Sequence, residues 1–152
     1  MPARDGIRKR RLGMNLKALV VLAGLAGLAA AAAAQDSFPP ELSYPGNVAL
    51  SRNSNGEWEY RKFPSLMPLY TYDLDKVGSG KSECGDTCTG ARPPLQVEKD
   101  DDKPVGRWTI IQREDGRRQW AYKGQPIYLR FHDVVGAPIG DNEEGIWHLM
   151  KP

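Results

Sequence analysis

From Val48 onward, apolar and polar positions follow the two-residue period of short β-strands. Residues 57–62 show this period most clearly, because Trp58 and Tyr60 alternate with charged neighbours. Further apolar or aromatic runs cover residues 69–74, 107–113, 118–122, 127–131 and 146–150. No window shows a sustained helical period. The pattern predicts a small, single all-β domain of about six short antiparallel strands.

Two turn signals connect the later runs. Residues 114–117 contain an Asp-Gly pair and residues 123–125 contain a Gly, and both types of sequence favour tight hairpin turns. Residues 110–131 are therefore predicted to form a three-stranded meander.

Two polar stretches interrupt the strands. Residues 78–94 hold four Gly and both Cys residues of the chain, which predicts an ordered loop. Residues 98–103 form an acidic bend that lacks the Gly turn and the distal Glu of a calcium loop. We expect the acidic bend to be solvated.

One aromatic pattern occurs twice. A Tyr stands five residues before an Asp in both copies, as Tyr70 and Asp75 in the first and Tyr128 and Asp133 in the second. Each copy is preceded by a Gly turn and a Trp-x-Tyr pair, namely Trp58 and Tyr60, then Trp120 and Tyr122. Such repetition indicates two related repeats within one domain. A half-buried Tyr hydroxyl needs a partner, and an Asp just past the strand can accept its proton or cap the following turn.

Residues 1–34 have the three zones of a secretory signal peptide. A basic stretch at residues 8–11 precedes an uncharged run at residues 18–34, which ends in three Ala residues. A permanent membrane anchor is the alternative, but a run of mostly Ala and Gly is short and weakly apolar for spanning a bilayer. We therefore expect a cleaved signal peptide helix, with membrane contact only through that segment.

The remaining chain divides into two parts. Residues 35–47 contain three Pro residues and predict a flexible N-terminal arm. Residues 48–152 are the predicted β domain. The expected location is the periplasm or the extracellular medium.

Charge changes the picture once the signal peptide is set aside. Residues 1–34 hold six of the 21 Lys and Arg residues but one of the 19 acidic residues, which leaves 15 basic against 18 acidic residues and a net charge of −3. Basic and acidic residues are interspersed beyond residue 34, so no basic stripe suggests contact with nucleic acid.

Several short motifs occur in a fixed order over residues 58–149. They are Leu69-Tyr70-Thr71-Tyr72-Asp73-Leu74-Asp75, Gly80-Lys81-Ser82-Glu83-Cys84-Gly85-Asp86-Thr87-Cys88, Pro93-Pro94-Leu95, Arg113-Glu114-Asp115-Gly116, Gln119-Trp120-Ala121-Tyr122, Gly124, Pro126-Ile127-Tyr128 and Gly145-Ile146-Trp147-His148. This order resembles the bacterial secreted-repeat proteins that are often described as predicted lipoproteins with a Tyr-x-aromatic-x-x-Asp motif. The resemblance implies an exported envelope domain of paired repeats whose role is unknown. It also implies motif positions at Tyr70, Tyr72, Asp75, Trp120, Tyr122, Tyr128, Asp133 and Trp147.

The chain departs from this pattern in three places. No lipid-attachment Cys follows the apolar run, so the chain is similar to a soluble relative. Arg92 stands where the pattern has a Trp, which predicts weaker packing under the Cys-containing loop. In the second repeat the aromatic residue is Phe131, one place later than Tyr72 in the first, and a bulge would reconcile the two registers.

Cys84 and Cys88 raise the main chemical question. In an exported protein, two Cys residues this close favour a local disulfide that closes a Gly-rich loop. A redox or copper-handling role is the alternative, because Cu(I) accepts two thiolates and an imidazole, and His132 or His148 could supply the third ligand. The disulfide interpretation implies no cofactor.

The aromatic residues allow two interpretations. They can fill a small core that has few Leu and Ile residues, or they can form an exposed surface that stacks against a ligand. The second interpretation requires Tyr70, Tyr72, Trp120 and Tyr128 to be exposed. Ser residues lack a nucleophile context and no phosphate-binding loop is present, so the sequence does not indicate an enzyme. The hypothesis is a binding or envelope-associated module whose partner is an unknown envelope protein or small ligand.

Overall fold

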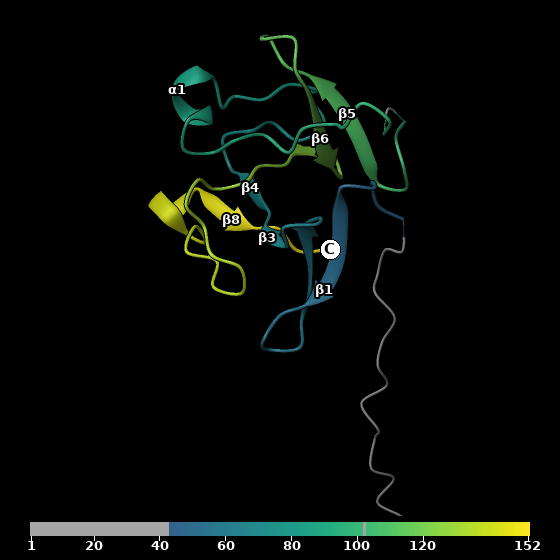
Figure 1. Cartoon of the computed structure of the whole chain (residues 1–152). Helices are drawn as coiled ribbons and strands as arrows, with labels where there is room; N and C mark the ends of the chain where they lie inside the picture. The colour runs from purple at the N-terminus through teal and green to yellow at the C-terminus, as the bar shows by residue number, and fades with distance from the viewer. Residues whose placement is uncertain (1–42, 102) are drawn as a thin grey trace, which may run out of the picture. The chain divides into compact units, whose positions relative to one another are not determined.

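The computed structural model describes residues 43–101 and 103–152. The predicted signal peptide and residues 35–42 of the predicted arm lie outside the described residues. The described residues belong to one compact unit and form three small antiparallel sheets with little helix (Figure 1). The prediction of an all-β fold is confirmed. In the part of the chain that is described, no helix has the length and apolar character needed to cross a membrane.

The first sheet has the order β1-β2-β3, with β1 at Val48–Arg52, β2 at Trp58–Lys62 and β3 at Met67–Pro68. The turn between β1 and β2 forms because the Asn53 side-chain oxygen accepts the backbone N–H groups of Asn55 and Glu57, at 2.9 and 3.0 Å. The strand predicted at residues 57–62 is therefore present as one half of a hairpin.

The second sheet has the order β5-β6-β7, with β5 at Trp108–Gln112, β6 at Arg118–Tyr122 and β7 at Gln125–Pro126. Both predicted turns are present. Gly116 has a φ of 81°, and Lys123 and Gly124 have φ values of 50° and 80°, which matches the left-handed conformation that tight hairpins require.

The third strand of the predicted meander differs from the prediction. It is β7, which ends at Pro126. The Ile127 N–H still donates to the Trp120 oxygen at 3.0 Å, and residues 128–131 leave the sheet. They bond instead with a different segment, since Leu129 N–H donates to the Pro93 oxygen and Phe131 N–H donates to the Ala91 oxygen, both at 2.8 Å. The prediction of a regular strand at residues 127–131 was wrong because the local pattern could not show this change of partner.

The third sheet joins the ends of the two repeats. It pairs β4 at Tyr70–Tyr72 with β8 at Trp147–Leu149, in antiparallel register. Figure 1 shows these strands in the middle of the view, with the β5–β6 hairpin above them and the β1–β2 hairpin below. Two short helical turns, α1 at Asp86–Thr89 and η1 at Glu143–Gly145, lie in the loops after each repeat's Asp.

Two buried clusters form the core. The larger cluster contains Val48, Tyr60, Leu69, Leu95, Trp108, Trp120, Tyr122, Ile127 and Met150. The smaller cluster contains Tyr70, Cys84, Tyr128 and Trp147. Aromatic rings dominate both, and Trp108 meets Tyr60 edge-on at a centroid distance of 5.1 Å. The interpretation of the repeated aromatic residues as core residues therefore holds for most of them.

The end of the predicted arm is part of the folded unit. Pro45 and Asn47 are buried, and Asn47 donates from its side-chain amide to the Gln96 oxygen at 2.9 Å. The Gly46 N–H donates to the Asp101 carboxylate at 2.7 Å. Asp101 in the acidic bend thus has a structural contact, although the sequence suggested only solvation there.

Candidate functional site

The two Tyr and Asp pairs of the repeated motif are exchanged between the repeats. The Tyr70 hydroxyl donates to Asp133 at 2.5 Å, and the Tyr128 hydroxyl donates to Asp75 at 2.6 Å. The backbones of the two Tyr residues also exchange N–H to oxygen bonds, each 2.9 Å long. Each Tyr therefore binds the Asp of the other repeat, so the motif joins the repeats to each other.

Both Asp residues also organise the loop that follows them. Asp75 accepts the Glu83 N–H at 2.7 Å, and Asp133 accepts the N–H groups of Val134 and Ile139 at 2.9 and 3.2 Å. Asp75 is 4% exposed, and it accepts from a Tyr hydroxyl and from the backbone of the loop after its strand, the two roles that the sequence suggested for it. The buried carboxylate is satisfied by two donors, the Tyr128 hydroxyl of the second repeat and the Glu83 N–H of the loop after the first.

A buried arginine accompanies each pair. Arg113 donates to the Ser82 hydroxyl at 2.9 Å, to the Gln119 side chain at 2.6 Å and to the Cys84 backbone oxygen. Ser82 in turn lies 2.7 Å from the Tyr128 hydroxyl. Arg113 therefore connects the Tyr128 and Asp75 pair to the Cys-containing loop.

Arg92 has the corresponding place beside Tyr70. Its guanidinium lies over the rings of Trp147 and Tyr70, at 4.3 and 5.1 Å from the centroids, and pairs with Glu143. Arg92 therefore packs on both rings and has an acidic partner, while the prediction that it packs less well than a Trp stays a prediction.

Burial controls the ionisation of these groups. It raises the pKa of Tyr70 and of Tyr128, and the hydrogen bonds to Asp133 and Asp75 raise them further. Burial also raises the pKa of Asp75, although the bonds from Tyr128 and the Glu83 N–H oppose this effect. Burial lowers the pKa of Arg92, and the nearby Glu143 charge opposes it. Both Tyr hydroxyls are therefore donors that stay protonated at neutral pH.

The predicted disulfide between Cys84 and Cys88 is present. Cys84 is fully buried in the smaller cluster, while Cys88, within α1, is partly exposed. The disulfide closes the loop that follows the first repeat.

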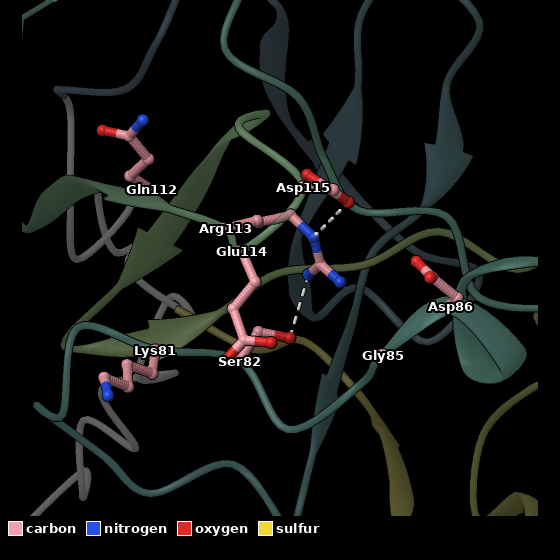
Figure 2. Close-up of a pocket in the computed structure, with 8 residues that line it drawn as sticks. All are labelled: Lys81, Ser82, Gly85, Asp86, Gln112, Arg113, Glu114 and Asp115. Atoms are coloured by element: carbon pink, nitrogen blue, oxygen red, sulfur yellow. Dashed lines mark hydrogen bonds and ion pairs between the residues drawn. The ribbon is translucent and has the colours of Figure 1, made fainter.

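A polar cavity of about 390 Å³ lies beside Arg113. Its lining residues are Lys81, Ser82, Gly85, Asp86, Gln112, Arg113, Glu114 and Asp115. Figure 2 shows the Arg113 guanidinium between Ser82 and Asp115, with Lys81 and Asp86 on opposite sides. Asp115 accepts from Arg117, which lowers its pKa to about 2. Arg113 is thus already bonded to several neighbours. We therefore interpret the polar cavity as the solvent-facing side of the hydrogen bonds around Arg113, which have a structural role.

A second cavity, of about 600 Å³, lies on the other side of α1 and is called the aromatic cavity below. Its lining residues are Tyr72, Thr87, Cys88, Ala91, Arg92, Arg130, Phe131, His132, Glu143, Glu144 and Trp147. Four of the residues highlighted by the sequence, Tyr72, Cys88, His132 and Trp147, meet here. Tyr72 stacks on Trp147 with ring centroids 4.2 Å apart, and Phe131 is 59% exposed.

Polar groups of the aromatic cavity are held in place by ion pairs. Arg130 bonds to both carboxylate oxygens of Glu143, at 2.9 and 3.0 Å, and this pairing lowers the pKa of Glu143. The cavity thus combines aromatic rings with a fixed and nearly charge-balanced set of donors and acceptors.

Other highlighted residues lie elsewhere. Trp120 and Tyr122 belong to the larger core cluster. His148 lies on β8, and its Nε2 atom is 2.9 Å from the Asp73 carboxylate. Over the described residues, no group of three or more His, Cys, Asp or Glu side chains is placed to hold a metal ion. The copper hypothesis stays a prediction, and it requires reduction of the disulfide before either sulfur can act as a thiolate ligand.

The alternative of an exposed aromatic surface for stacking is contradicted by the burial of most of the residues that it requires. Tyr70, Trp120 and Tyr128 are fully buried, so they offer no face to a ligand. Tyr72 alone among the four is partly exposed, and it lines the aromatic cavity. The sequence missed the buried Arg113 and the partly exposed Glu143 as site residues, because nothing local distinguishes an ion-paired residue from a solvated one.

Comparison with known proteins supports one family. A search of the curated proteins and a search of the solved structures found no match. Residues 109–151 match the model of a family described as a secreted repeat of unknown function. This segment runs from β5 to β8 and contains Tyr128, Asp133 and most of the aromatic cavity. The description as secreted fits an exported protein. Residues 109–151 of this chain are thus similar to a secreted repeat of unknown function, as the order of motifs predicted.

Proposed function

We propose that the chain is an exported, non-catalytic binding module associated with the cell envelope, and that its ligand site is the aromatic cavity. The signal-like sequence of residues 1–34 and the family match support export. The volume of the cavity, about 600 Å³, falls in the range of roughly 300–1,000 Å³ that small-ligand sites occupy.

Backbone strain around this cavity is the observation that carries the proposal. His132 and Glu144 line the cavity with φ values of 59° and 55°, and the neighbouring Asn142 has 57°. Left-handed conformations of residues other than Gly cost free energy and concentrate at functional sites. Three such residues around one cavity indicate that its shape is maintained at a cost to stability.

A buried donor supports the same site. Arg92 lines the cavity, its side chain is 4% exposed, and its Nη1 atom has no hydrogen-bond partner among the described residues. An unpaired buried donor is unfavourable, so Arg92, like the strained residues, is held beside the cavity at a cost to stability.

The ionisation of the groups near the cavity favours binding over catalysis. Burial keeps Tyr70 protonated, and the Arg130 bond keeps Glu143 ionised. A general acid or base works best with a pKa near the working pH. The pKa of neither Tyr70 nor Glu143 is shifted toward neutral pH.

Two measurements test this function. Mass spectrometry of the protein recovered from the periplasm or medium of expressing bacteria should show a chain that begins near Gln35; a full-length chain retained in the cytoplasm would contradict export. The exported protein is then titrated with the small-molecule fraction of an envelope extract while tryptophan fluorescence is followed, since Trp147 lines the cavity.

A pair of surface variants locates the binding. Phe131→Ala removes an exposed ring of the cavity, whereas Val77→Ala removes an exposed side chain outside it, and the two residues are 59% and 62% exposed. The proposal expects Phe131→Ala to weaken the fluorescence response and Val77→Ala to leave it unchanged. An equal response in both variants, or none in the parent protein, would remove the aromatic cavity as the binding site.

A redox or copper-handling role is the second candidate, because Cys88 and His132 line the same cavity. Under this alternative, the reduced protein binds one equivalent of Cu(I) tightly and Cys84→Ser abolishes that binding. The binding-module proposal expects no tight Cu(I) site and a disulfide that resists mild reductant.

A further inference from the structure

We propose that the aromatic cavity binds a pyranose saccharide. The inference rests on the proposed function, since it names the ligand class of the same site. It is drawn from the combination of ring faces, charge balance and fixed polar groups in the lining.

The aromatic rings of the cavity favour a ligand with an apolar face. Tyr72 and Trp147 are stacked at an interplanar angle of 15° and a centroid distance of 4.2 Å. Trp147 is 4% exposed and Arg92 lies over its ring, so the partly exposed Tyr72 is the ring of this stack that a ligand in the cavity can reach. Phe131 adds an exposed ring next to His132, with centroids 4.1 Å apart. A ligand that uses these rings needs an apolar face, and the C–H groups of a pyranose ring provide one.

The charges of the cavity lining favour a neutral ligand. Arg92 and Arg130 face Glu143 and Glu144 in the same lining, and Glu143 is paired with both arginines. An anionic ligand would have to displace Glu143 from those pairs, and a cationic ligand would have to compete with the arginines. A neutral ligand requires neither change.

The polar groups of the cavity lining favour a ligand with hydroxyl groups. Arg130 holds Glu143 through two bonds of 2.9 and 3.0 Å, so the guanidinium and carboxylate form a fixed planar surface with donors and acceptors at its edges. A purely apolar ligand would leave these groups unsatisfied, whereas the hydroxyls of a saccharide both donate and accept. An apolar face and a hydroxyl edge on one rigid neutral ring match the lining as a whole.

The test uses named probes on the exported protein. Chitotetraose, cellotetraose and maltotetraose are titrated at up to millimolar concentration, with tryptophan fluorescence and calorimetry as readouts. The proposal expects at least one of them to bind. Phe131→Ala should weaken that binding about tenfold, the equivalent of one lost stacking contact, and Val77→Ala should leave it unchanged.

A second arm separates this inference from the proposed function. The small-molecule envelope extract is treated with periodate, which cleaves the vicinal diols of saccharides, and is then titrated again. Loss of the cavity-dependent response supports a saccharide. A response that survives periodate, with no binding of the three oligosaccharides, overturns the saccharide and leaves the binding module intact. If untreated extract gives no cavity-dependent response, the proposed function itself fails.

Discussion

At the residue scale, the repeated Tyr and Asp residues join the two copies of the motif. The four residues Tyr70, Asp75, Tyr128 and Asp133 are called the lock below. Tyr70 with Asp133 and Tyr128 with Asp75 make short side-chain bonds across the repeats. Because both Tyr side chains are fully buried, neither Tyr hydroxyl can exchange its Asp partner for bulk water without opening the core. The motif is thus explained by stability, and the cavity that we propose as the ligand site lies beside it.

Removing one hydroxyl tests this lock. Tyr128→Phe keeps the ring in the core but deprives the buried Asp75 of its 2.6 Å donor. We expect it to lower the free energy of unfolding by about 1–3 kcal/mol, the usual penalty for a buried polar group that loses its partner. Urea denaturation measures the effect. Tyr44→Phe is the matched control, since Tyr44 is 38% exposed. Equal stability of the two variants would contradict the lock.

The pH dependence of the same residues gives a second test. The folded-state pKa values of Tyr70 and Tyr128 are raised by burial and by their Asp partners. An unfolded Tyr ionises near pH 10, so the protonated folded form loses stability as pH rises above about 10. In an alkaline absorbance titration, these two Tyr residues should ionise only as the fold is lost.

The Tyr70→Phe and Tyr128→Phe double variant provides the control for that titration. The component of its absorbance change that coincides with unfolding, as followed by circular dichroism, should be smaller than in the parent protein, because only the buried Tyr60 and Tyr122 of the larger cluster still contribute to it. If the parent protein ionises all of its Tyr residues before any loss of structure, the raised pKa values are refuted.

The sequence predicted which residues of the lock matter but not how they pair. A spacing of five residues between Tyr70 and Asp75 suggests a contact within one repeat. The actual partners are separated by 63 and 53 residues, and only the antiparallel contact between the repeats brings them together. Arg92 illustrates the same limit, because its stacking on Trp147 depends on a residue far along the chain.

At the element scale, strands with an alternating pattern and a Gly turn were predictable, whereas strands defined by distant partners were not. The β5–β6 hairpin has its expected turn, and its strands pair in antiparallel register from Trp108 with Tyr122 to Gln112 with Arg118. Residues 127–131 have the composition of a strand, but they pair with residues 91–95 through scattered bonds. Composition reports that a segment is extended and half-buried, and it does not report the neighbour that covers it.

Two turn glycines differ in a way that can be measured. Gly116 and Gly124 have nearly equal φ values, 81° and 80°, but a Cβ at Gly116 meets nothing within 4 Å, whereas one at Gly124 lies 2.9 Å from the Gly78 nitrogen. Gly116→Ala should cost about 1 kcal/mol of stability through backbone strain alone. Gly124→Ala should cost more, since it also presses on the backbone of the Cys-containing loop.

Thermal unfolding of both variants beside the parent protein provides the measurement. The Gly85→Ala variant serves as a control, because a Cβ there has no neighbour within 4 Å and Gly85 has no positive φ. A smaller loss for Gly124→Ala than for Gly116→Ala would show that the 78–94 loop does not pack on the β6–β7 turn as described.

At the scale of the whole molecule, the two repeats depend on each other. The sheet of β4 and β8, the exchanged Tyr and Asp pairs and the stacking of Arg92 on Trp147 all join the first repeat to the second. The family match covers only the second repeat. The exchange of partners implies that one such repeat in isolation lacks the residues that complete its own motif.

Separated repeats are therefore expected to be unfolded. A fragment of residues 107–152 keeps Tyr128 and Asp133 but loses Asp75 and Tyr70. The Tyr128 hydroxyl and the Asp133 carboxylate then lack their partners across the repeats, and the smaller core cluster is exposed. Its amide NMR spectrum should show the narrow dispersion of a disordered chain, as should that of residues 43–97.

Mixing the two fragments should restore dispersed signals if the interface between repeats is sufficient for assembly, and Tyr128→Phe in the second fragment should weaken that restoration. A well-dispersed spectrum from residues 107–152 alone would contradict mutual dependence. It would mean that the larger, aromatic cluster around Trp108 and Trp120 folds without the first repeat, and that the exchanged pairs orient two independent modules around the aromatic cavity instead of holding one fold together.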